Sequence, residues 1–170
     1  MDLYMVILRL LHIPAGILWV GFGLFMLGFA MPAALQLPDR GGQFVRMLYH
    51  RQQLGRAFPI LALITTVAGI LLYLRVSDMF NGAWMSSPGG IVLTIGSLAG
   101  IGAFLHGIKL GADSEAQVAL LDEVAAQGGP PTPEQAQKLA EIGQKVFRSS
   151  VISSLLMIIA VIGMSTARYF

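Results

Sequence analysis

Four long apolar stretches without an Asp, Glu, Lys or Arg residue divide this 170-residue chain, and they constrain its fold more than any other feature. They cover residues 10–37, 57–74, 79–108 and 149–167. Each is about long enough to cross a hydrocarbon core of roughly 30 Å as a helix, at ~1.5 Å per residue. Because lipid cannot satisfy backbone N–H and C=O groups, helices are the structures expected there. The sequence therefore predicts an all-α fold, an integral membrane four-helix bundle.

The segment between the third and fourth apolar stretches is the only sizeable part expected outside the membrane. Ser114 and Thr132 have the spacing of helix N-caps, and the run Gly128–Pro131 breaks the chain between them. These signals predict a cytoplasmic helical hairpin that extends spans three and four. We expect a single domain over residues 1–170, with spans at about 6–34, 56–75, 88–110 and 147–168 and the hairpin at about 111–146.

Basic residues are distributed unevenly between the two sides of the predicted bundle. Eight of the eleven Lys and Arg residues lie in the segments after spans one and three, and three lie on the opposite side. Cytoplasmic loops of membrane proteins carry the excess of Lys and Arg. This asymmetry predicts a multi-pass protein of the inner (plasma) membrane with both termini outside the cytoplasm.

Composition excludes several kinds of chemistry. The chain is 55% hydrophobic and has no cysteine, which rules out disulfides, iron–sulfur clusters and cysteine-linked haem. It carries no nucleotide-binding loop and no basic run of the kind that binds nucleic acid, so no nucleic-acid partner is expected. The lipid bilayer is the expected partner. Other membrane redox subunits and a second copy of the chain remain open as further partners.

Three histidines are the residues most indicative of function, because an ionisable side chain inside a membrane is costly unless it is paired or used. His12 lies in span one, His50 just before span two, and His106 near the end of span three. Haem iron accepts an axial imidazole, with His or Met as the second ligand. The sequence therefore predicts b-type haem, held by ligands chosen from these histidines.

A glycine lies one helical turn from each of two of these histidines. Gly16 and Trp19 share a helical stripe with His12, and Gly102 precedes His106 by one turn. A glycine beside an imidazole leaves a flat slot of the kind that a porphyrin needs. Small residues equally allow membrane helices to pack closely, and the sequence leaves both interpretations open.

Depth in the membrane limits which residues can share one iron. His12 is expected near the outer face and His106 near the inner face, about 30 Å apart. His50 should be level with His106, which makes these two the natural ligand pair for an inner site. His12 would need another partner near the outer face, where Met164 and Met5 are expected. The sequence thus allows an inner haem, an outer haem or both.

Two further sets of residues suggest ligands. Arg46 and Arg51 belong to a basic rim that suits haem propionates or lipid phosphates, although the cytoplasmic excess of positive charge explains the rim equally well. Copper is the alternative metal, because thioether sulfur suits Cu(I). Methionines expected toward the outer face are Met1, Met5, Met79, Met85 and Met164.

The run Leu11-His12-Ile13, followed by Trp19 and Gly21, resembles the first-span signature of two membrane families. These are the copper-resistance protein D-like family and the four-helix, haem-linked protoporphyrinogen oxidase family. Further residues resemble the second family's basic segment and its second and third spans: Phe44, Met47-Leu48-Tyr49, Arg51, Pro59, Gly69-Ile70-Leu71-Leu72, Trp84 and His106.

This resemblance implies a membrane redox protein with b-type haem, in which His12 takes the place of the family's first-span histidine. One departure concerns the activity. The oxidase family has a lysine at the start of its third span, where this chain reads Pro88-Gly89-Gly90-Ile91. We therefore expect a haem-binding electron-transfer protein or a subunit of a redox complex and, if it is an enzyme, a membrane oxidoreductase. Copper transport or resistance, and a non-catalytic accessory subunit, are the alternatives.

Overall fold

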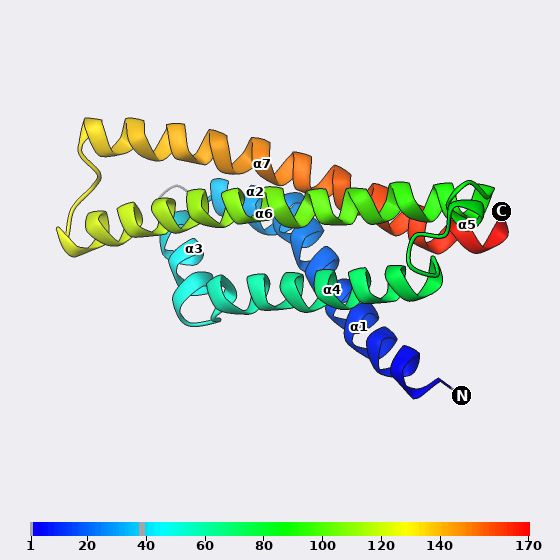
Figure 1. The fold of residues 1–170 in the computed structure, drawn as a ribbon. Helices are drawn as coiled ribbons and strands as arrows, with labels where there is room; N and C mark the ends of the chain where they lie inside the picture. The colour runs from blue at the N-terminus through cyan, green and yellow to red at the C-terminus, as the bar shows by residue number, and fades with distance from the viewer. Residues whose placement is uncertain (1, 38–39) are drawn as a thin grey trace.

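A computed structural model describes residues 2–37 and 40–170, and within these residues it contains helices and no strand. The all-α prediction is confirmed (Figure 1). In chain order the helices are α1 (Leu3–Phe25), the π-helical segment η1 (Met26–Ala30), α2 (Met31–Leu35), α3 (Gly41–His50), α4 (Leu54–Val76), α5 (Gly82–Met85), α6 (Pro88–Ala126), α7 (Pro133–Thr166) and the 3₁₀ turn η2 (Ala167–Tyr169).

Four helical segments are long and apolar enough to cross a membrane, which confirms the predicted class. They run over Leu3–Leu35, Leu54–Val76, Pro88–Ala126 and Pro133–Tyr169. Large apolar side chains cover their outer surfaces, as expected of helices that face lipid rather than water.

Both chain ends lie toward the same end of the bundle, although apart from one another, and the loop between α6 and α7 lies at the other end (Figure 1). We call these the terminal end and the hairpin end. α6 and α7 run antiparallel along their whole length, and α4 lies beside α6. α1 packs mainly against α4 and crosses the bundle obliquely, so its first half diverges from α6 and α7.

One buried cluster joins all four spans near the middle of the bundle. It consists of Trp19 from α1, Ala62 from α4, Ala103 from α6 and Met157 from α7. Each of these residues is at most 6% exposed. Trp19 therefore serves as a core residue that fixes where the four helices cross.

Glycines bring α6 and α7 into backbone contact at the terminal end. A Cβ atom built on Gly163 would lie 2.8 Å from the Cα of Gly96, closer than real side chains approach. Farther along, a Cβ on Gly100 would lie 3.7 Å from the Cβ of Ala160. Such close approach increases the van der Waals contact between the two helices. This contact is important in lipid, where the burial of apolar surface contributes little to helix association.

The first span is interrupted near its hairpin end by η1. Pro32 follows this segment and has no N–H group to donate to the carbonyl of Gly28. The N–H of Met31 instead bonds to the carbonyl of Met26, five residues back. The proline thus gives a physical reason for the wider turn.

The hairpin extends α6 and α7 beyond the other two spans (Figure 1). This arrangement was predicted from the sequence between the third and fourth apolar stretches. The expected N-cap at Thr132 is confirmed, since its hydroxyl accepts from the N–H of Gln135 in a capping box. The expected helix start at Ser114 is wrong: α6 passes through it without a break. Ser114 is buried, and its packing within the folded protein outweighs its preference for a helix start.

Candidate functional site

His12 lies between α1 and α4 with its ring held in one orientation. Its Nδ1 is 2.8 Å from the carbonyl oxygen of Thr65. A carbonyl can only accept a hydrogen bond, so Nδ1 carries the proton in this pair. The neutral ring therefore keeps an unprotonated lone pair on Nε2, the form in which imidazole binds metals.

Gly69 makes room for the ring one turn beyond Thr65 on α4. A Cβ atom at this position would lie 2.8 Å from Cε1 and 2.9 Å from Nδ1 of His12. A larger residue at position 69 would displace the ring and lengthen its bond to Thr65. Thr65 and Gly69 are thus site residues that the sequence analysis did not identify, since only the packing of α1 on α4 brings them to His12.

Gly16 contributes to the contact between α1 and α4 rather than to an open slot. A Cβ atom on Gly16 would lie 3.4 Å from the Cγ2 of Thr65. Of the two interpretations that the sequence left open, a porphyrin slot and close helix packing, the contact at Gly16 fits close helix packing. At Gly102 a Cβ would lie 3.7 Å from Leu156 of α7, which is an ordinary contact distance, so the packing there leaves room for a methyl group.

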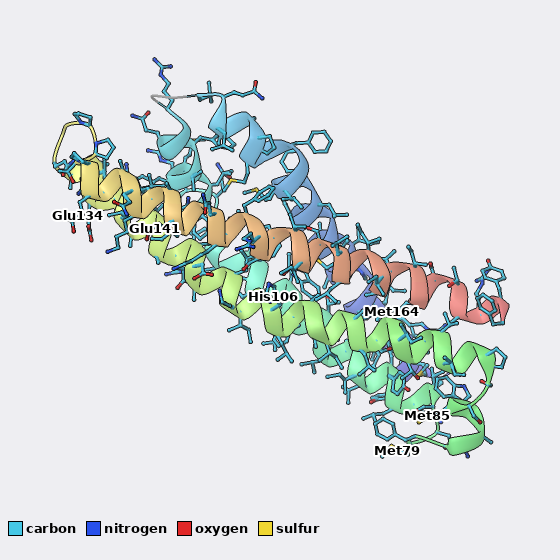
Figure 2. All side chains as sticks on the ribbon, turned by 90° about the horizontal axis from the view of Figure 1, so that it is seen from above. Met79, Met85, His106, Glu134, Glu141 and Met164 are labelled. Carbon is cyan, nitrogen blue, oxygen red and sulfur yellow. The ribbon has the colours of Figure 1, made fainter. Side chains whose placement is uncertain are left out.

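His106 lies near the middle of α6 (Figure 2). Its Nε2 is buried and has no hydrogen-bond partner among the residues described. The hydroxyl of Ser153 on α7 is also buried and without such a partner. Because Gly100 packs on Ala160 and Gly143 on Gln117, the antiparallel register places Ser153 about level with His106.

His12 and His106 lie at different levels of the bundle, but the offset between them is smaller than the ~30 Å that the sequence predicted. Trp19 and Ala103 lie in one cluster, and α1 and α6 run in the same direction. His12 precedes Trp19 by about two turns, whereas His106 follows Ala103 by about one turn. The two histidines are therefore offset along the bundle by roughly 10–15 Å, at ~1.5 Å per residue.

His50 lies far from His106, so the expected pairing of these two histidines is wrong. The Nε2 of His50 is 2.9 Å from a carboxylate oxygen of Asp122. Asp122 follows His106 by sixteen residues on the continuous helix α6, or ~24 Å at ~1.5 Å per residue. The physical reason is α3, which packs beside the hairpin extension of α6 and carries His50 away from the spans.

Asp122 connects α3 to α6 through both of its carboxylate oxygens. One accepts from the Nε of Arg46, and the other lies against His50. Tyr49, also on α3, interacts with Ser114 of α6, and burial raises the pKa of its hydroxyl. This phenol therefore stays protonated at neutral pH. Arg46 has a structural partner here, whereas Arg51 is exposed.

Replacement of Asp122 by alanine is expected to loosen α3 rather than unfold the bundle. The side chains of this ion pair are about one third exposed, and such pairs contribute roughly 0–1 kcal/mol. Hydrogen exchange should become faster in residues 41–50, while the thermal midpoint changes little. Unchanged exchange in α3 would show that its apolar contacts suffice. Asp113→Ala, which removes an ion pair within α6, is the matched control.

Met164 packs against Gly100 of α6. A Cβ on Gly100 would lie 3.5 Å from the Cε of Met164. Figure 2 shows Met164 on α7, with Met79 and Met85 farther toward the terminal end. Among residues 2–37 and 40–170, no group of three or more His, Cys, Asp or Glu side chains could hold a metal ion. A metal at His12 would thus depend on this imidazole and on a cofactor's own ligands.

The unpartnered hydroxyl of Ser153 gives a second testable result. A buried polar group without a hydrogen bond costs about 1–3 kcal/mol. Ser153→Ala should therefore leave the thermal midpoint unchanged or raise it. Ser87→Ala is the contrasting control, because Ser87 caps α6 through the N–H of Gly90 and its loss costs ~1 kcal/mol. A lower midpoint for Ser153→Ala would instead show that this hydroxyl makes a stabilising interaction.

No protein-family model, curated protein or solved structure matches this chain at a significant level.

Proposed function

We propose that this chain is a membrane electron-transfer protein that binds b-type haem through the Nε2 of His12, acting alone or as a subunit of a larger redox complex. The observation that supports this function is the hydrogen bond from Nδ1 of His12 to the carbonyl of Thr65. Histidines that ligate metals almost always donate their other N–H to a carbonyl, carboxylate or water. The haem iron would supply one-electron redox chemistry.

The protein's own residues prepare the imidazole for that role. Thr65 fixes the tautomer through its carbonyl, and Gly69 allows the ring to lie against α4. α1 packs mainly on α4, and its first half diverges from α6 and α7 (Figure 1), while His12 itself is half-buried. A cofactor could therefore approach His12 from the side away from α4 without separating the α6–α7 pair.

The absorption spectrum of the detergent-purified protein, oxidised and then reduced with dithionite, tests this proposal. We expect a Soret band, sharp reduced α and β bands, and a pyridine haemochrome of the b type. The protein should be produced in cells supplied with a haem precursor, and the apoprotein should be titrated with haemin. A flat spectrum after both treatments would contradict haem binding. Metal analysis of the same sample would then distinguish a copper protein from an accessory subunit without metal.

A further inference from the structure

An apolar groove of about 440 Å³ lies where α1, α3 and α4 meet, toward the hairpin end. This volume falls in the usual range for small-molecule sites. Gln52 is the one polar residue among those that line it. The lining residues are Phe22, Phe25 and Met26 from the first span, Met47 and Leu48 from α3, Gln52, and Leu54, Ala57, Phe58 and Leu61 from α4.

The groove has an apolar body and a polar mouth. Its α4 residues begin at Leu54, the first residue of the second span, and extend two turns into that span. Gln52 lies just before this helix, at the membrane boundary. On the first span the groove ends at Met26, where the π-helical segment begins. Such segments are frequent at functional sites.

A positive charge stands at this mouth. Arg51 follows Met47 by one turn, its backbone is still helical, and it adjoins Gln52. Arg51 is exposed and is not itself one of the lining residues, but Met47 and Gln52 on either side of it both line the groove. Within residues 2–37 and 40–170, no carboxylate is within salt-bridge distance of Arg51, whereas Arg46 is paired with Asp122.

We propose that this groove binds one anionic phospholipid, with an acyl chain among the phenylalanine and methionine side chains and the phosphate at Arg51 and Gln52. Charge complementarity selects this occupant. An exposed guanidinium beside an apolar channel matches a molecule with a phosphate at one end and a hydrocarbon chain at the other. This inference is independent of haem binding, since no histidine lines the groove.

Native mass spectrometry of the full chain tests the proposal by competition between phosphatidylglycerol and phosphatidylcholine with identical acyl chains. We expect the wild-type protein to retain phosphatidylglycerol preferentially. Arg51→Gln should reduce that preference about fivefold, the effect of one basic residue near an anionic lipid surface. Ala57→Phe should fill the groove and reduce retention of both lipids.

Arg56→Gln is the matched control, because it also removes one positive charge but from a side of α4 that does not face the groove. Arg56 is exposed and lies about 150° around α4 from the face formed by Leu54, Phe58 and Leu61, at ~100° per residue. It should leave the lipid preference unchanged. Equal losses from Arg51→Gln and Arg56→Gln, or equal retention of the two lipids by the wild type, would overturn the proposal. Retention that Ala57→Phe does not change would also overturn it.

Discussion

Replacement of His12 by alanine is expected to abolish the reduced α and β bands. It should also lower the haem content to the background of a sample prepared from cells that do not produce the protein. The protein would lose its only proposed iron ligand, together with the hydrogen bond to Thr65. Pyridine haemochrome, normalised to protein, measures the loss. Gly69→Ala should give a weaker or shifted spectrum, because its Cβ would displace the ring of His12.

Two further variants separate ligation from folding. His12→Asn keeps an N–H near the position of Nδ1 and can preserve the bond to Thr65, but it offers no imidazole to iron. It should therefore lose haem while it elutes as a monodisperse peak. His50→Ala is the matched histidine control, since His50 is exposed and bonded to Asp122. If His12→Ala retained its spectrum while His106→Ala lost it, the ligand would be His106 and our assignment would be wrong.

Replacement of Gly163 by alanine adds only one methyl group, but it is expected to lower the free energy of unfolding strongly. That methyl group would lie 2.8 Å from the Cα of Gly96 and 3.1 Å from its nitrogen. Backbone atoms cannot rotate away as a side chain can, so α6 and α7 must move apart. Overpacking of this kind costs about 1–3 kcal/mol, and we expect the upper part of that range. The thermal midpoint in one detergent, followed by circular dichroism, measures the change.

Gly107→Ala provides the control for this result. Gly107 lies in the same pair of helices, but a Cβ there meets nothing within 4 Å. Alanine is a better helix former than glycine by ~1 kcal/mol, so this variant should be neutral or slightly more stable. If both variants changed stability equally, helix propensity rather than the contact between Gly96 and Gly163 would govern the pair.

The sequence predicted the helices well because the signals involved are local. Apolar length identified all four spans, and the capping residues identified the start of α7 at Thr132. Ser114 shows the limit of such signals, since its capping pattern is real but lies inside α6. The short helix α3 was not predicted; it carries His50 and Arg46, and Arg51 follows directly after its last residue.

Only part of the candidate site could be predicted from the sequence. His12 stood out because an ionisable residue in an apolar stretch is unusual, and this judgement needs no knowledge of neighbours. Thr65 and Gly69 carry no such signal, since a threonine and a glycine are ordinary residues of membrane helices. Their role depends on the crossing of α1 and α4, which joins residues 53 positions apart.

By itself, the sequence determined that this chain forms four membrane-spanning helices with a long hairpin, because the cost of exposing backbone polar groups to lipid leaves no other structure for such stretches. Only the tertiary structure decided which histidines have partners. It directs Nδ1 of His12 to Thr65, leaves Nε2 of His106 buried without a hydrogen-bond partner among the described residues, and places His50 beside Asp122. These outcomes depend on helix crossing and register, which are set by packing between residues far apart in the chain.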